Sequence, residues 1–183
     1  MNNTNGKIAA QSRQKMVLAL LTLMEGYDYR EITVTQIAQE ARLSRKTFYR
    51  LFTGKDEILS LFFEGLFQQW SAQITARNVH HYWDVVQLFF DFWEERRPLL
   101  ALLQKNGLLQ RVFEQSYRYS LPVFASVRSR ETVDALSCSL PYMLAYSVGG
   151  MHSMLLKWME LGMEIPSHEL IATLKAGFQS ESL

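Results

Sequence analysis

Apolar residues recur along this chain at intervals of three and four residues, which is the spacing of one buried face of an α-helix. No segment alternates apolar and polar residues as a half-buried β-strand would. The pattern therefore predicts an all-α protein. The predicted helices begin at or after Lys7 and cover residues 7–25, 34–41, 45–51, 56–77, 82–95, 98–105, 108–127, 132–161 and 167–178.

Short polar motifs mark the starts of several predicted helices. Thr33 precedes Gln36 by three residues, the spacing of a capping box in which each side chain bonds to the backbone N–H of the other residue. Ser44 is suited to cap the helix that follows it, and Thr53 is suited to cap the next one. Pro141 lies within a long predicted helix and either kinks it or marks the true start of a separate helix.

Residues 33–52 have the form of a helix-turn-helix, in which a turn at residues 42–44 joins two short helices. Phe48 and Phe52 lie one helical turn apart and are predicted to face the core. The outer side of the second helix then carries Arg45, Lys46, Thr47, Tyr49 and Arg50. These long donors and hydroxyls suit phosphates and base edges in the major groove of DNA. They also suit an ordinary solvated helix face, and pairs of short amphipathic helices occur in many bundles.

The formal net charge of only +1 hides an uneven distribution. Residues 1–55 carry nine Lys or Arg and four Asp or Glu, which is a net charge of +5. Residues 56–183 carry ten Lys or Arg and fourteen Asp or Glu, which is a net charge of −4. A basic head on an acidic body is expected of a protein that binds a polyanion at one end.

Cys138 is the only cysteine, so an intrachain disulfide is excluded and a reducing compartment is favoured. Residues 1–6 offer no basic segment followed by an apolar run, so no secretory signal is predicted. Residues 135–156 contain no charged side chain and approach the length of a membrane span. Their serines, Pro141 and His152 nevertheless favour a buried helix. These features predict a cytoplasmic protein with no membrane segment.

Four N-terminal segments agree in residue type, order and spacing with a known signature: Gly26-Tyr27, Ile32–Ala38, Leu43–Phe52 and Gly54–Leu59. Together they resemble the TetR/AcrR family of transcriptional regulators over roughly residues 7–61. Further along, Val148–His152, Lys157-Trp158 and Gly162-Met163 are similar to a C-terminal subgroup of that family. The subgroup includes regulators and a type of co-activator that binds a protein partner.

The resemblance implies a three-helix helix-turn-helix domain at residues 1–54, which binds double-stranded DNA at a palindromic operator. Residues 55–183 would form a helical domain for dimerisation and ligand sensing. By position, the resemblance assigns DNA contacts to Arg45, Lys46, Thr47 and Tyr49 of the recognition helix, and phosphate contacts to Thr35 and Lys55. Arg50 joins this set because of its outward position.

Two residues depart from the family pattern. Arg42 stands where a turn glycine is usual, which predicts a tighter or shifted turn. Leu51 replaces a frequent histidine, which removes one polar contact and favours an inward orientation.

Aromatic residues crowd the second part of the chain and either fill a helical core or line a pocket for a small apolar or aromatic effector. The predicted pocket residues are Trp93, Phe113, Tyr117, Tyr142, Tyr146 and His152. In the family, the last two helices pair with their copies in a second subunit. This implies a homodimer interface at Val148, Met151, Leu155, Trp158, Leu170, Ile171, Leu174 and Phe178.

The sequence shows no metal-ligand spacing, phosphate loop or nucleophile motif, so no enzyme activity, cofactor or metal is predicted. The predicted function is a homodimeric repressor, which a ligand releases from DNA by shifting the long fourth helix. The alternative is a co-activator with the same fold that acts through a protein partner. The basic head argues against this alternative, because a co-activator would not need to retain Arg45, Lys46, Arg50 and Lys55. The altered Arg42 and Leu51 keep it open.

Overall fold

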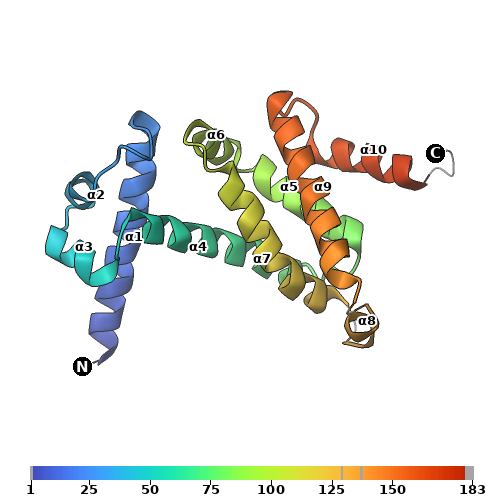
Figure 1. Ribbon diagram of the computed structural model, residues 1–183, viewed down its shortest axis with the longest axis horizontal. Coiled ribbons are helices and arrows are strands. Elements are labelled where there is room, and N and C mark those ends of the chain that lie inside the picture. Colours follow the sequence, from blue (N-terminus) through green and yellow to red (C-terminus); the bar gives the residue numbers. More distant parts are fainter. Residues whose placement is uncertain (1, 129, 137, 180–183) are drawn as a thin grey trace. The chain divides into compact units, whose positions relative to one another are not determined.

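The computed structural model describes residues 2–128, 130–136 and 138–179, and within them the regular elements are all helices (Figure 1). The all-α prediction is confirmed. The helices are α1 (Asn2–Gly26), α2 (Val34–Glu40), α3 (Arg45–Leu51), α4 (Lys55–Ala76), α5 (Tyr82–Glu94), α6 (Arg97–Lys105), α7 (Leu109–Val127), α8 (Arg130–Ala135), α9 (Leu140–Glu160) and α10 (Ser167–Gln179). Side chains are described for residues 6–128, 133–136 and 138–177.

The chain divides into two compact units. The first contains the described residues up to Leu66 together with Ala101–Leu108, and the second contains Phe67–Leu100 and the described residues from Leu109 onward. The polypeptide therefore leaves the first unit within α4 and returns to it for a short segment at the end of α6. These units are defined by contacts, and the functional division at residue 54 stays a prediction.

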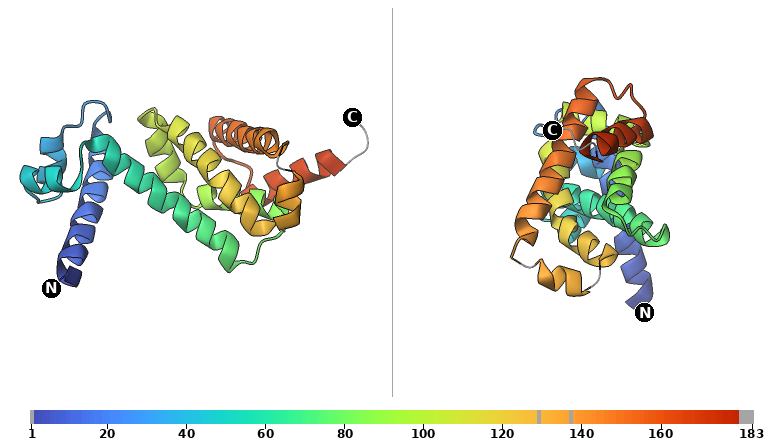
Figure 2. Two further views of the ribbon diagram at one scale, coloured as in Figure 1. Left: turned by 60° about the horizontal axis from the view of Figure 1, so that its bottom comes forward. Right: turned by 90° about the vertical axis from the view of Figure 1, so that its right-hand side faces the viewer.

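In the first unit, α1 packs against both α2 and α3 (Figure 2). Helices α2 and α3 have seven residues each, which is well below the length at which a helix is stable by itself in water. Their stability must therefore come from buried apolar contacts. The side chains that supply this core are Met16, Leu20 and Met24 of α1, Ile37 of α2 and Phe48 of α3, each at most 1% exposed.

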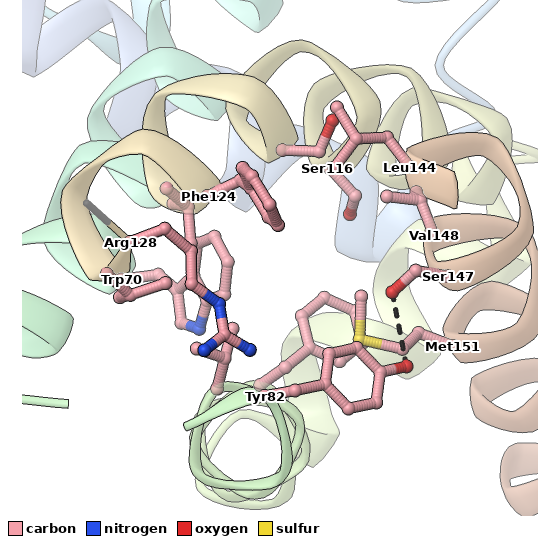
Figure 3. Close-up of a pocket in the computed structure, with 14 residues that line it drawn as sticks. Trp70, Tyr82, Ser116, Phe124, Arg128, Leu144, Ser147, Val148 and Met151 are labelled. Carbon is pink, nitrogen blue, oxygen red and sulfur yellow. Dashed lines mark hydrogen bonds between the residues drawn. The ribbon is translucent and has the colours of Figure 1, made fainter. Parts of the chain in front are cut away.

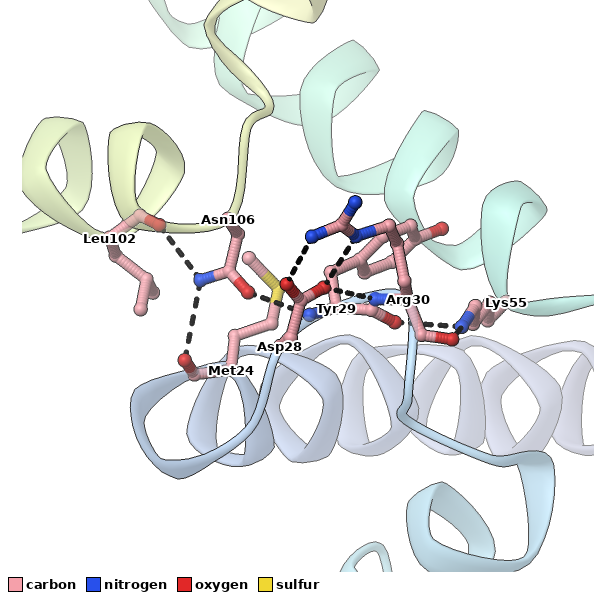
Figure 4. A network of polar contacts seen from close by, with 7 residues as sticks. All are labelled: Met24, Asp28, Tyr29, Arg30, Lys55, Leu102 and Asn106. Carbon is pink, nitrogen blue, oxygen red and sulfur yellow. Dashed lines mark hydrogen bonds and ion pairs between the residues drawn. The ribbon is translucent and has the colours of Figure 1, made fainter.

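A buried amide secures the loop that follows α1 (Figure 4). Asn106, which lies just after α6 and is 7% exposed, accepts a hydrogen bond from the backbone N–H of Tyr29 at 2.8 Å. Its side-chain nitrogen donates to the carbonyl groups of Met24 at 3.3 Å and Leu102 at 2.9 Å. One side chain thus satisfies three backbone groups, and it ties the segment 101–108 to the end of α1.

Lys55, the first residue of α4, holds the same loop from its other side (Figure 4). Its ammonium group donates to the carbonyl oxygens of Tyr29 at 2.7 Å, Arg30 at 2.8 Å and Ile32 at 2.9 Å. The Tyr29 hydroxyl in turn donates to the carboxylate of Asp56 at 2.7 Å. The Lys55 side chain therefore satisfies three carbonyl groups of the loop between α1 and α2.

The second unit is built around the aromatic helix α5. Phe89, Phe90 and Trp93 are at most 2% exposed, and α10 packs on the same helix. Ser167 fixes the start of α10, since its hydroxyl donates to Asp91 at 2.6 Å and its backbone N–H donates to Glu94 at 3.1 Å. Helices α7 and α9 pack together in the same unit (Figure 1).

The single helix predicted for residues 132–161 is wrong, because the structure has α8 and α9 there. Pro141 lies in the first turn of α9. Proline lacks a backbone N–H and is tolerated at that position, where the N–H would have no helical partner. Of the two interpretations of Pro141, the separate helix start is therefore confirmed. Within the described residues, no helix combines the length and apolarity that crossing a membrane requires.

Candidate nucleic-acid interface

The predicted capping box at the start of α2 is confirmed. The backbone N–H of Thr33 donates to the Gln36 side chain at 2.8 Å, and the backbone N–H of Gln36 donates to the Thr33 hydroxyl at 3.3 Å. The two bonds satisfy N–H groups that have no helical acceptor. Thr35 lies in the first turn that follows and is exposed.

The turn between α2 and α3 keeps a geometry that glycine normally provides. Arg42 has a φ of +54°, in the left-handed region. Its backbone N–H donates to the carbonyl of Gln39 at 3.0 Å, and the N–H of Leu43 donates to the carbonyl of Ala38 at 2.9 Å. This pair of bonds defines a Schellman motif with its left-handed residue at the C′ position. The predicted departure at Arg42 therefore leaves the turn in place and adds backbone strain instead.

A cap and an aromatic anchor fix helix α3. The backbone N–H of Thr47 donates to the Ser44 hydroxyl at 3.0 Å, which confirms the predicted N-cap. On the inner side, Phe48 is 0% exposed, and its ring centroid lies 5.8 Å from that of Phe52. The cap sets where the helix begins, and the anchor sets which of its sides faces solvent.

The outer side of α3 gathers four of the predicted contact residues: Arg45, Lys46, Tyr49 and Arg50. All four are exposed, and Tyr49 presents 55% of its surface. In the described part of the chain, no carboxylate forms an ion pair with any of these three cations. Thr47 differs from them, because it is half-buried and its hydroxyl shares a hydrogen bond of 2.9 Å with Ser44.

Lys55 does not extend toward the exposed side of α3. Its ammonium group already has the three carbonyl acceptors of the α1–α2 loop, so a phosphate would have to displace one of them. The arrangement therefore does not favour the predicted side-chain contact at Lys55. Thr53 also differs from expectation, because both its N–H and its hydroxyl donate to the carboxylate of Glu57, at 2.7 Å and 3.0 Å.

Two carboxylates of the first unit, Asp28 and Glu57, are engaged locally. A side-chain hydrogen bond from Arg30 and a second one from its backbone N–H lower the pKa of Asp28 to about 2. The backbone N–H of Thr53, followed by its hydroxyl, lowers the pKa of Glu57. Both groups are charged at neutral pH, and neither forms an ion pair with a residue of α3. The positive charge of α3 is thus left without a compensating partner in the described residues.

The six side chains predicted to form a ligand pocket do not gather at one site, although Phe113 lies beside both His152 and Tyr117. Trp93 is completely buried in the core, and Phe113 packs on His152 with their ring centroids 5.0 Å apart. Burial lowers the pKa of His152 and favours its neutral form. Tyr117, Tyr142 and Tyr146 are exposed, the last two by more than three quarters of their surface.

The structure shows a different cavity in the second unit, of about 80 Å³. Its wall contains apolar residues from four helices together with Arg128, and none of the six predicted residues. A neighbouring groove of about 360 Å³ includes Tyr146, the only one of the six that lines either space. Sequence periodicity predicts which residues are buried, but it does not predict where packing between helices leaves a cavity. The residues of this cavity could therefore not be identified from the sequence.

The residues predicted for a dimer interface fall into two groups. Val148, Leu155, Trp158 and Ile171 are at most 4% exposed within one chain. A side chain that its own chain already covers has no area left to bury against a partner, so these four belong to the core. Met151, Leu170 and Leu174 are partly exposed, and the side chain of Phe178 lies outside the described ones.

The capped helix pair, its buried anchor and its unpaired cations define a helix-turn-helix domain of the kind that bacterial regulators use to bind DNA. A family profile described as "Bacterial regulatory proteins, tetR family" matches residues 18–61. Residues 18–61 of the chain are therefore similar to the N-terminal domain of TetR-family regulators.

A curated relative is the HTH-type dhaKLM operon transcriptional activator DhaS of Lactococcus lactis subsp. lactis (strain IL1403). It is 39% identical over 102 residues, which cover 55% of this chain and 48% of that protein. The match thus spans about half the length of the relative. No solved structure matches the chain.

Replacing Arg42 by glycine is expected to raise the free energy of unfolding by about 1 kcal/mol. Glycine adopts the left-handed conformation without the steric penalty of roughly 1–2 kcal/mol that a side chain incurs, although greater freedom of the unfolded chain offsets part of this gain. Arg42→Ala removes the same charge but keeps a Cβ, so it should gain nothing. Chemical denaturation of the three proteins measures the difference, and equal stability of the two variants would refute the explanation.

Proposed function

We propose that the protein is a homodimeric transcriptional regulator that binds a palindromic operator through α3. We also propose that a small molecule bound in the second unit releases it from DNA. In this mechanism α4, which contributes residues to both units, carries the change between them. The ligand acts by binding one conformation more tightly than the other, so it shifts the population of DNA-competent dimers.

The observation that carries the DNA-binding proposal is the contrast between the two sides of α3. The inner side is held by Phe48, which is completely buried. The outer side presents Arg45, Lys46 and Arg50 without ion-pair partners in the described residues, and Tyr49 lies among them. Arg and Lys reach phosphates and guanine edges, and a rigidly anchored helix of this size enters the major groove.

The dimer proposal rests on the side of α9 that faces away from its own core. Exposed on it are Tyr142, by 78% of its surface, and Tyr146, by 76%. A Cβ added at Gly149 would meet no atom within 4 Å, so packing within one chain does not require glycine there. Close approach of a second copy of α9 would require it. This outward side replaces the four buried residues as the proposed interface, and a two-fold dimer would set two α3 helices about 34–36 Å apart.

The direction of regulation separates two candidates. The effector-release mechanism describes a repressor. The relative DhaS, in contrast, is named as an activator, and the match to this chain covers about half of its length. Measuring transcription from the bound promoter with and without the protein decides between the two. A third candidate, a co-activator that acts through a protein partner, predicts no DNA binding by the purified chain.

Arg45→Ala/Lys46→Ala is expected to weaken binding to the DNA that flanks the protein's own gene. Two lost phosphate contacts should also flatten the slope of log K against log salt by roughly two units. Titration of labelled duplex at several salt concentrations measures both effects. The matched control is Arg77→Ala/Arg118→Ala, which removes two exposed charges from the second unit and should leave binding unchanged.

Weak wild-type binding that responds neither to DNA sequence nor to the α3 substitutions would contradict self-recognition of a nearby operator. That result would favour the co-activator. An equal loss of affinity in the α3 variant and in the control would mean that net charge alone, rather than α3, holds the DNA.

Gly149→Leu is expected to shift the protein toward monomers without lowering the stability of the chain. Leucine is a better helix former than glycine by roughly 1 kcal/mol, so only the close approach of a second helix makes it unfavourable. Analytical ultracentrifugation of wild type, Gly149→Ala and Gly149→Leu measures the dimer dissociation constant. A monomeric wild type, or a Gly149→Leu dimer as tight as the wild type, would argue against this interface.

A further inference from the structure

The cavity of the second unit lies among α4, α5, α7 and α9 (Figure 3). Apolar side chains such as Val85, Phe89, Val123 and Met151 form most of its wall. A cavity of about 80 Å³ is roughly half the size of one that accepts benzene. It therefore suits the chain or ring edge of a small molecule rather than a drug-sized ligand.

Arg128 is the single charged residue in this wall. It is exposed, and no carboxylate of the described residues forms an ion pair with it. Its guanidinium group has five N–H donors in a planar fork that matches a carboxylate. The wall contains no Asp or Glu that could take that position.

Trp70 lines the same cavity and supplies a second donor without a partner. Its side chain is 4% exposed, and its indole N–H is buried without an acceptor in the structure. A buried polar group left unpaired costs free energy, so an acceptor brought by a ligand would be favourable there. Figure 3 draws Trp70 and Arg128 on one side of the cavity, with Leu144 and Val148 on the other.

The hydroxyl groups of the wall are already engaged. Ser116 donates to the carbonyl of Val112 at 2.8 Å, and Ser120 donates to the carbonyl of Tyr117 at 2.7 Å. Ser147 donates to the Tyr82 hydroxyl at 3.1 Å (Figure 3). Besides the O–H of Tyr82, which accepts from Ser147 and can still donate, the unmatched donors of the wall are those of Trp70 and Arg128.

We infer that this cavity binds a small carboxylate with an apolar tail. Its carboxylate pairs with Arg128 and accepts from the Trp70 indole, while its tail lies among the apolar side chains. Such an acid would be the effector of the proposed regulator, so its regulatory role rests on the proposed function, but its binding does not. The residues Tyr82, Ser147 and Met151 also line the groove of about 360 Å³, so they form a wall between the two spaces. The apolar tail of a longer acid could extend into that groove.

The test compares hexanoate with 1-hexanol and butyrate with 1-butanol, because each pair shares an apolar tail and differs in charge. Ligand-observed NMR and isothermal titration with the full chain, without DNA, measure binding. We expect both acids to bind at least tenfold more tightly than their alcohols. Arg128→Gln should weaken the acids about tenfold and leave the alcohols unchanged. Arg118→Gln removes an exposed arginine that does not line the cavity, so it serves as the charge-matched control.

Trp70→Phe keeps an aromatic ring but removes the N–H, and it should weaken the acids severalfold. Acids and alcohols that bind equally, no binding of either acid at millimolar concentration, or an Arg128→Gln protein with wild-type affinity would each overturn the inference. Because the assay contains no DNA, these outcomes are independent of whether α3 binds an operator. Adding the acid to a DNA-binding assay then tests the regulatory role separately.

Discussion

Phe48 is completely buried, and the helix that carries it has only seven residues. Such a helix has no stability of its own, so α3 exists because this ring is packed in the core of the first unit. The same contact fixes the rotation of α3, which places Arg45, Lys46, Tyr49 and Arg50 on the solvent side. The packing of Phe48 thus determines both the stability of α3 and the direction in which its charged side chains point. A substitution that loosened the ring would remove the proposed reading surface together with part of the core.

The loop between α1 and α2 is held in place by hydrogen bonds from two polar side chains. Asn106 bonds to backbone groups of α1, of the loop that follows it and of α6. Lys55 bonds to three carbonyl groups of the same loop. Both side chains come from later parts of the sequence and converge on the same loop. Because unsatisfied buried groups are costly, these contacts favour one conformation of the α1–α2 connection. The ammonium of Lys55 is committed to this loop, so it stabilises the DNA-binding unit from within.

The local sequence signals predicted the caps of α2 and α3 correctly, although Thr53 bonds to Glu57 instead of capping α4. Thr33, Gln36 and Ser44 act within one helical turn, and their caps were predicted at the correct residues. Sequence reasoning failed where the outcome depends on residues far apart in sequence. Val148, Leu155 and Trp158 have the periodicity of an apolar stripe, but periodicity does not tell a stripe that meets its own core from one that meets a partner. The cavity beside Trp70 and Arg128 was missed for a similar reason, because a gap is a property of packing between helices.

The central claim is that α3 is the surface that meets DNA, and hydrogen–deuterium exchange tests it on the unmodified protein. Exchange is compared for the free chain, for the chain with duplex from the flank of its own gene, and for the chain with an unrelated duplex. The account predicts slowed exchange in peptides that cover α2 and α3, stronger with the flanking duplex than with the unrelated one. Protection confined to the second unit, or none with either duplex at a saturating concentration, would contradict it.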